Sequence, residues 1–268
     1  MIISFHRLGK FTAVAVLLSV VAFATIAYAS HSWGSYHWAR TLSPFNLKLG
    51  DNVSAAWDSH LNTASGDWSV SSVLDTTVIA GASKRNCGPV NGRVEVCNKK
   101  YGSNGWLGVA SIWVSGSHIT QGTVKLNDTY FNTATYNTPA WKQFVMCQEV
   151  GHTFGLDHQD VNFSNTNLGT CMDYTNNPSG SPSNERPNAH DYDQLELIYS
   201  HLDSVTTVGQ AVSQPHGNGN AAEADEAAEA DDDDAGKVLR KDNEGRPALY
   251  ERDLGKGDKL FTFIFWTE

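Results

Sequence analysis

The chain has 268 residues, of which 40% are hydrophobic and 18% are charged. This composition is that of a globular protein and excludes a wholly disordered chain. The formal net charge of −10 excludes the basic surface that nucleic-acid binding requires, so we expect no nucleic-acid partner.

Residues 1–29 have the pattern of a signal peptide. A short basic start precedes an apolar run over 11–27, and the sequence Ala-Tyr-Ala at 27–29 is an A-x-A cleavage site. The alternative is an uncleaved membrane anchor. We expect cleavage before Ser30, secretion to the extracellular space, and no membrane contact after the signal has been removed.

Short strands and one helix are predicted in the first half of the domain. A helix is predicted over 54–63, where Ser54 provides a start signal. Segments with β-rich or alternating sequences lie at 47–49, 73–80, 93–97, 109–114 and 123–126. The last of these is short and polar, which is typical of the edge of a sheet.

Two helices follow the strands. The longer one has Thr138 as N-cap, Pro139 in the first helical position, and Gly155 as the C-terminal stop. A second helix is predicted over 191–201, from apolar residues at near-helical spacing. This order of elements predicts an α/β (α+β) fold with a mixed sheet.

The chain divides into three parts by composition. A single domain is expected over 30–204, behind the signal peptide. Residues 205–268 are expected to form an acidic, disordered tail, because 221–234 is almost only Ala, Glu and Asp. Removal of this tail should leave folding intact. Two alternatives stay open: the acidic run forms a helix or binds calcium weakly, and the apolar run at 260–266 adds a strand.

The cysteine count indicates disulfide bonds, since an exported chain meets an oxidising environment. Four cysteines allow three pairings. The Asn-Gly turn signal at 91–92 lies between Cys87 and Cys97 and favours their pairing across a hairpin. That leaves Cys147 with Cys171. The alternative is free thiols.

The end of the long helix contains candidate metal ligands. Gln148 and His152 lie one turn apart on the same helix face, with Glu149 beside them. Gly155 allows a sharp turn that returns His158 toward the same point. Three protein ligands and one water form an open catalytic zinc site, in which a neighbouring carboxylate accepts a proton from the water.

These residues resemble the metzincin metalloproteases, whose motif is H-E-x-x-H-x-x-G-x-x-H followed by a Met-turn. The match comprises Glu149, His152, Gly155 and His158, and Met172 is similar to the methionine of the Met-turn. Overall the domain looks closest to matrixin-like secreted peptidases. The resemblance implies a twisted mixed β-sheet with an active-site helix, a Met-turn and a C-terminal helix.

The resemblance also implies roles for the site residues. Zn²⁺ would be held by His152 and His158, and Glu149 would act as general base. The phenol of Tyr174 would act at the metal or the oxyanion, and an extended peptide substrate would lie beside the predicted edge strand at 123–126. A bond between Cys147 and Cys171 would then support the site mechanically.

One position departs from the family motif, because Gln148 stands where the first histidine ligand belongs. An amide oxygen binds zinc more weakly than an imidazole does, so metal affinity is expected to fall. Alternatively Gln148 is a hydrogen-bonding residue that does not touch the metal. Asp157, Asp160 and His190 are then the substitute ligands to consider.

The sequence therefore predicts a secreted, monomeric zinc metalloendopeptidase that acts on a peptide or protein. One alternative is a pseudoprotease that has lost activity through Gln148 and binds peptide or protein without cutting it. Another is an exported metal-binding protein without peptidase activity. A structural Ca²⁺ ion is an additional expectation.

Overall fold

The computed structural model describes residues 31–82, 86–209 and 236–267. The predicted signal peptide over 1–29 and the acidic run at 221–234 lie outside these ranges. Within them, no helix has both the length and the apolar character needed to cross a membrane.

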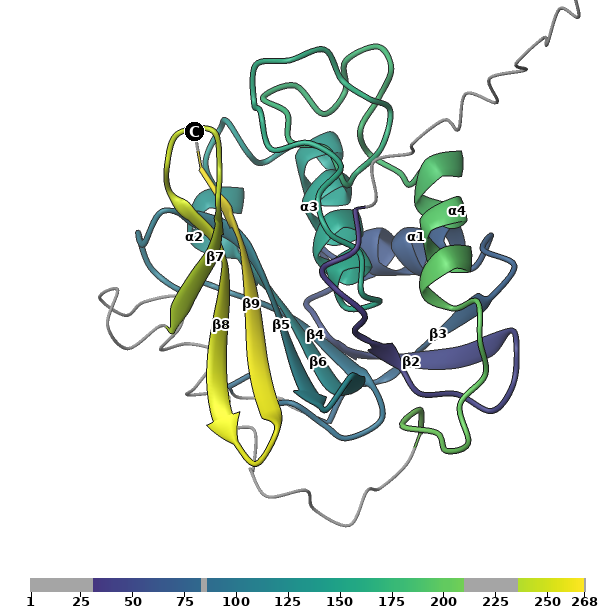
Figure 1. Cartoon of the computed structure of the whole chain (residues 1–268). Coiled ribbons are helices and arrows are strands. Elements are labelled where there is room, and N and C mark those ends of the chain that lie inside the picture. The colour runs from purple at the N-terminus through teal and green to yellow at the C-terminus, as the bar shows by residue number, and fades with distance from the viewer. Residues whose placement is uncertain (1–30, 83–85, 210–235, 268) are drawn as a thin grey trace, which may run out of the picture.

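One twisted sheet contains all the strands of the described ranges (Figure 1). Its order is β3-β2-β4-β6-β5-β9-β8-β7, and the short β1 pairs with β6. The strand bounds are β1 His37–Trp38, β2 Phe45–Asn52, β3 Leu74–Ala80, β4 Val94–Lys99, β5 Trp106–Ser115, β6 His118–Asn127, β7 Lys237–Lys241, β8 Pro247–Gly255 and β9 Asp258–Trp266.

The sheet is mixed, which confirms the predicted fold class. Strands β2, β3, β4 and β6 are parallel to one another, whereas β5 runs antiparallel to β6 and to β9. The prediction that 123–126 forms the sheet edge is wrong, since β6 lies between β4 and β5. The polar residues that suggested an exposed edge, Thr123 and Lys125, are buried on this central strand.

Two helices pack against each other and against one face of the sheet (Figure 1). They are α1, Asp58–Trp68, and α3, Pro139–His152; the other helices are α2, Asp128–Phe131, and α4, Ala189–Ile198. The start of α3 is as predicted, with the Thr138 hydroxyl accepting a hydrogen bond from the Trp141 amide at 3.2 Å. Helix α1 begins later than predicted, because 54–57 form a turn closed by a Trp57 N–H to Ser54 C=O bond.

The C-terminal strands contradict the predicted disordered tail over residues 236–267. In β9, Phe261, Phe263 and Phe265 are buried in the main core, while Ile264 packs in a separate cluster with Trp106 and Val109 of β5. This alternation is the period of a strand that is covered on both faces. The alternative that 260–266 adds a strand is therefore correct, and the apolar run supplies the burial that the acidic run lacks.

Both predicted disulfide bonds are present. Cys87 bonds to Cys97 with their Cα atoms 6.0 Å apart, and Cys147 bonds to Cys171 at 5.9 Å. These separations lie within the usual range for disulfides. The second bond joins α3 to the loop that contains Met172. Two disulfide bonds with no free cysteine are typical of proteins that fold in an oxidising compartment.

Candidate metal centre

Two histidines meet where α3 ends. His152 is the last residue of α3, and the chain turns at Gly155, which has a φ of +98°. A side chain there would lie 2.6 Å from the backbone oxygen of Tyr36, so only glycine suits this turn. The turn brings Nε2 of His158 within 2.9 Å of Nε2 of His152, as the motif predicts.

The environment of this pair suits a bound cation. Burial lowers the pKa of His152 to about 3 and lowers the pKa of His158 well below its usual value. Nδ1 of His152 donates to the Leu156 carbonyl at 2.9 Å, so its Nε2 presents a lone pair. Neutral imidazole is the form that binds zinc, and a cation between the two Nε2 atoms would satisfy both.

Gln148 lies one turn earlier on α3 and is completely buried. Its Nε2 donates to the Cys171 carbonyl at 2.9 Å. Its Oε1 has no hydrogen-bond partner among the described residues, and an unpaired buried acceptor costs about 1–3 kcal/mol. A cation at this oxygen would remove that cost, so the donor set of Gln148, His152 and His158 fits a metal ion.

Glu149 lies beneath β5. Its side chain is completely buried, and a side chain at Gly108 would come within 2.5 Å of its Oε1. Burial raises the pKa of Glu149 well above its usual value, and a hydrogen bond from the Ala110 backbone offsets only part of this shift. A raised pKa is the direction that a carboxyl needs in order to exchange a proton near neutral pH.

Met172 and Tyr174 complete the surroundings of the pair. A Cβ atom at Gly151 would lie 2.7 Å from the Met172 sulfur, so the thioether packs against α3 beside His152. The Tyr174 ring lies 4.6 Å from the His158 ring, and its hydroxyl donates to the Ile264 carbonyl of β9 at 3.4 Å. Both side chains are buried.

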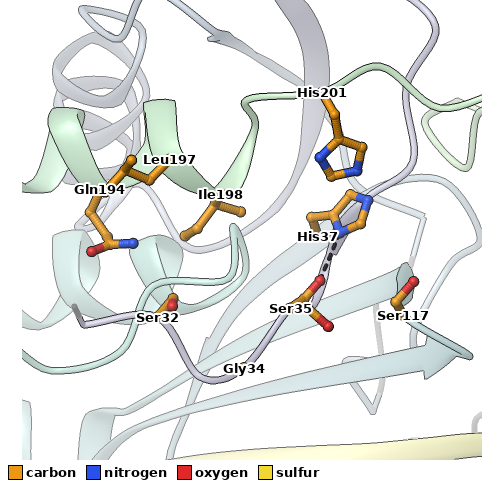
Figure 2. Close-up of a pocket in the computed structure, with 9 residues that line it drawn as sticks. All are labelled: Ser32, Gly34, Ser35, His37, Ser117, Gln194, Leu197, Ile198 and His201. Atoms are coloured by element: carbon orange, nitrogen blue, oxygen red, sulfur yellow. Dashed lines mark hydrogen bonds between the residues drawn. The ribbon is translucent and has the colours of Figure 1, made fainter.

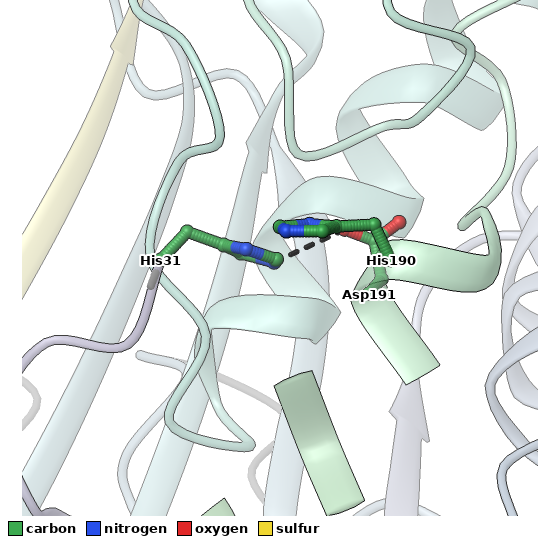
Figure 3. Close-up of side chains that lie close together, drawn as sticks. All are labelled: His31, His190 and Asp191. Atoms are coloured by element: carbon green, nitrogen blue, oxygen red, sulfur yellow. Dashed lines mark ion pairs between the residues drawn. The ribbon is translucent and has the colours of Figure 1, made fainter. Parts of the chain in front are cut away.

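The alternative ligands have other partners. Asp157 forms an ion pair with Arg240 of β7. His190 stacks on His31 at 4.7 Å, and Nε2 of His31 lies 3.1 Å from Oδ1 of Asp191 (Figure 3). Oδ1 of Asp160 accepts a hydrogen bond from the Asn162 amide at 2.6 Å.

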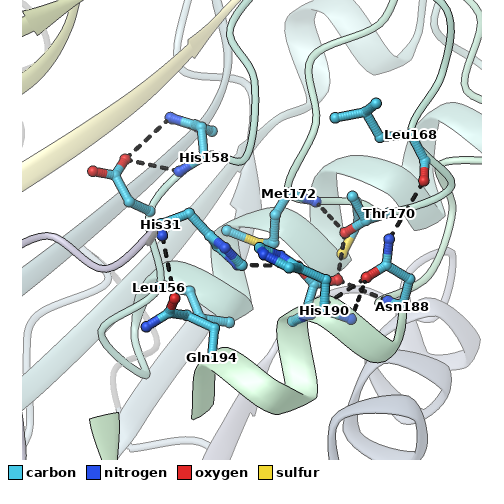
Figure 4. A network of polar contacts seen from close by, with 12 residues as sticks. His31, Leu156, His158, Leu168, Thr170, Met172, Asn188, His190 and Gln194 are labelled. Carbon is cyan, nitrogen blue, oxygen red and sulfur yellow. Dashed lines mark hydrogen bonds and ion pairs between the residues drawn. The ribbon is translucent and has the colours of Figure 1, made fainter. Parts of the chain in front are cut away.

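The group of His31, His190 and Asp191 is linked to the Met-turn loop (Figure 4). Asp191 accepts a hydrogen bond from the Thr170 hydroxyl, which in turn accepts from the Met172 amide at 3.0 Å. The spacing of these ligand atoms would also allow a metal ion. Sequence reasoning considered His190 alone, because His31 is far from it in the chain.

The C-terminal strands cover the His152–His158 pair. The Phe263 ring stacks on the His152 ring with centroids 4.2 Å apart and planes at 11°. Phe265 packs on Tyr174 at 4.8 Å. Both phenylalanines come from β9, which pairs with the outer edge of β5 (Figure 1). The centre therefore lies beneath the C-terminal strands, which the sequence did not reveal.

Comparisons with known proteins give little further guidance. No family model matches the chain, and no curated protein matches it. Among solved structures, the fold is similar to that of high choriolytic enzyme 1, a hatching enzyme zinc-protease from the medaka fish Oryzias latipes. The TM-score is 0.34 with 11% sequence identity, over 63% of this chain and 96% of that chain. A likeness this low carries no functional inference.

Proposed function

We propose that this chain is a secreted zinc metalloendopeptidase whose active site is covered by its own C-terminal strands. The observation that carries the proposal is the pair of buried, neutral imidazoles, His152 and His158, with Nε2 atoms 2.9 Å apart; the buried Glu149 lies three residues before His152 on α3. Two imidazoles joined by a glycine turn at the end of a helix belong to the ligand pattern of catalytic zinc sites.

Each residue of the centre has a role in peptide hydrolysis. His152 and His158 would hold the metal, and Oε1 of Gln148 would provide a third, weaker ligand. When bound, zinc supplies polarisation of a water molecule and of the scissile carbonyl. Glu149 accepts a proton from the water and passes it to the leaving amine. The Tyr174 hydroxyl donates a hydrogen bond to the oxyanion once it leaves the Ile264 carbonyl.

The substrate would bind at the outer edge of β5. An extended peptide adds to a sheet by pairing with an exposed edge strand. Without the C-terminal strands β7, β8 and β9, strand β5 would be the edge of the sheet. Strand β9 holds this position with Ala110 opposite Phe263 and Gly108 opposite Phe265. Peptide cleavage would therefore require β9 to move away from β5.

A pseudoprotease is the second candidate, and two observations favour it. The amide of Gln148 is engaged by the Cys171 carbonyl, and Phe263 covers His152. A chain of this kind would bind peptide or protein without cutting it.

Zinc content and casein cleavage, measured on the full mature chain, test the proposal. His152→Ala should lower the zinc content by one equivalent. Glu149→Ala should keep the zinc and abolish cleavage, because it removes the base and no metal ligand. Phe263→Ala should raise cleavage by uncovering His152. No cleavage in any variant, together with binding of a peptide, would identify a pseudoprotease, and an unchanged zinc content in His152→Ala would refute the zinc peptidase.

A further inference from the structure

Three imidazoles surround one carboxylate at a place separate from the His152–His158 pair. Oδ1 of Asp203 lies 3.4 Å from Nε2 of His37, 3.4 Å from Nε2 of His118 and 3.6 Å from Nε2 of His201. His37 is in β1, His118 begins β6, and His201 and Asp203 follow α4. Four side chains from three distant parts of the sequence therefore converge on one point.

These distances match ligand spacing better than hydrogen bonding. A hydrogen bond from an imidazole N–H to a carboxylate is about 2.7–2.9 Å long. In a tetrahedral zinc site with bonds of about 2.0–2.1 Å, neighbouring ligand atoms lie about 3.3 Å apart. The three measured distances fall close to this second value. The ligand atoms of His37, His201 and Asp203 also lie within 4.8 Å of one another, whereas His118 approaches Asp203 without belonging to this group.

The orientation of the His37 ring also supports a metal site. Its Nδ1 lies 2.8 Å from the Ser35 carbonyl (Figure 2), and a nitrogen facing a carbonyl oxygen must be the one that donates. In the neutral ring Nε2 is then an acceptor, and it faces the acceptor oxygen of Asp203. A cation between the two atoms makes this contact favourable, whether it is a proton on Nε2, which gives a hydrogen bond of 3.4 Å, or a metal ion. Metal-bound histidines commonly donate their other N–H to a backbone carbonyl in this way.

The carboxylate is also held in place by its surroundings. Oδ2 of Asp203 accepts from the Arg40 amide at 2.9 Å, which leaves Oδ1 directed at the imidazoles. The Arg40 guanidinium donates to the His201 carbonyl. In metal sites, the residues that bind the ion are typically held in place by further hydrogen bonds of this kind.

The site is open on one side. His37 is buried, whereas His118 and His201 have 31% and 55% of their side-chain surface exposed. A cavity of about 470 Å³ borders His37 and His201 and is also lined by Ser35, Ser117 and Ile198 (Figure 2). A metal ion has a route from solvent to the four ligand atoms.

We propose that His37, His201 and Asp203 form the core of a second, structural zinc site, which His118 completes by turning its ring toward the ion. Three imidazole nitrogens and one carboxylate oxygen suit zinc, whereas calcium takes only oxygen ligands. Four protein ligands leave no position for a catalytic water. The ion would tie the N-terminal segment and the residues after α4 to the turn between β5 and β6.

Two substitutions in the full mature chain test this site. His201→Asn and His118→Asn should each lower the zinc content by one equivalent, and the chelator EDTA should then lower the melting temperature less than it does in the unmodified chain. Because both side chains are partly exposed, neither change should prevent folding. His60→Asn is the matched control and should retain the zinc, since His60 of α1 lies 3.2 Å from Oε1 of Gln143 and belongs to neither group of candidate ligands.

These measurements test the second zinc site independently of the proposed peptidase site. The zinc lost in His201→Asn is independent of the zinc lost in His152→Ala, so either site can fail alone. Replacement by Co²⁺ adds a spectroscopic check, because the tetrahedral Co²⁺ spectrum should lose one component in His118→Asn. Full zinc content in both His118→Asn and His201→Asn would overturn the second site, as would an equal loss of zinc in the control His60→Asn.

Discussion

The ring of Phe263 lies parallel to the ring of His152, with centroids 4.2 Å apart and an interplanar angle of 11°. Phe263 is in β9, and His152 ends α3, more than one hundred positions earlier in the chain. The next residue of β9, Ile264, packs on the opposite face with Trp106 and Val109. A single strand thus covers the candidate metal centre with alternate side chains only.

This relationship predicts that Phe263→Ala uncovers the centre. Zinc bound at His152 should transfer to a chelator several-fold faster, because the stacked ring that excludes water has been removed. Ile264→Ala is the matched control: it deletes a buried apolar side chain from the same strand but on the other face. The chelator reaction, followed by a coloured zinc indicator, measures the rates. Equal rates in the two variants would mean that Phe263 does not control access.

The second prediction concerns removal of the C-terminal strands. Ending the chain at residue 209 removes three buried phenylalanines, Phe261, Phe263 and Phe265, each contributing about 1.5–3 kcal/mol of burial. It also exposes the edge of β5, which favours aggregation. The free energy of unfolding should therefore fall by several kcal/mol in urea denaturation.

Because a truncated chain of this kind is at risk of not folding, Phe265→Ala in the full chain provides a milder measurement. A large-to-small change in a core costs about 3–5 kcal/mol for phenylalanine. An unchanged urea midpoint in both proteins would show that β9 adds no stability to the domain.

The third prediction concerns the departure from the family motif. Gln148→His places an imidazole on the helix face that also presents His152, and imidazole nitrogen binds zinc better than amide oxygen does. Zinc affinity should increase at least about tenfold, or roughly 1.4 kcal/mol. Titration against a competing chelator measures this change. Gln148→Ala should shift affinity in the opposite direction, and no response to either substitution would place residue 148 away from the metal.

The fourth prediction concerns the disulfide between α3 and the Met172 loop. Cys147 and Cys171 are 24 positions apart, and closing a loop of this length stabilises a protein by about 3 kcal/mol in the chain-entropy account. The double change Cys147→Ser and Cys171→Ser should lower stability by about that amount. Zinc affinity should also decrease, because Gln148 bonds to the Cys171 carbonyl.

Peptide mapping without reduction checks the pairing itself. Linked peptides that contain Cys87 with Cys97 and Cys147 with Cys171 are expected. A peptide that joins Cys87 to Cys171 is incompatible with the structure.

The local features of the centre were predictable from the sequence alone. Thr138, Pro139 and Gly155 define the start of α3 and the turn beyond its end through backbone preferences that act over a few residues. The spacing of His152 and His158 across that turn predicts that they meet, and they do at 2.9 Å. These are short-range effects, so local sequence is sufficient to reveal them. The Cys87–Cys97 bond was also predicted and is present, but the hairpin that suggested it is not: residues 86–93 form turns and coil, and β4 pairs with β2 and β6.

Only the tertiary structure decided which strand is the edge and what covers the centre. The alternating pattern of 123–126 is compatible with an edge strand and with a central one, because periodicity shows which side chains share a face and not which strand lies alongside. The pairing of β9 with β5 depends on contacts between residues more than 140 positions apart. The convergence of His37, His118 and His201 on Asp203 has the same origin, since folding brings these four side chains together from distant segments and no local pattern connects them.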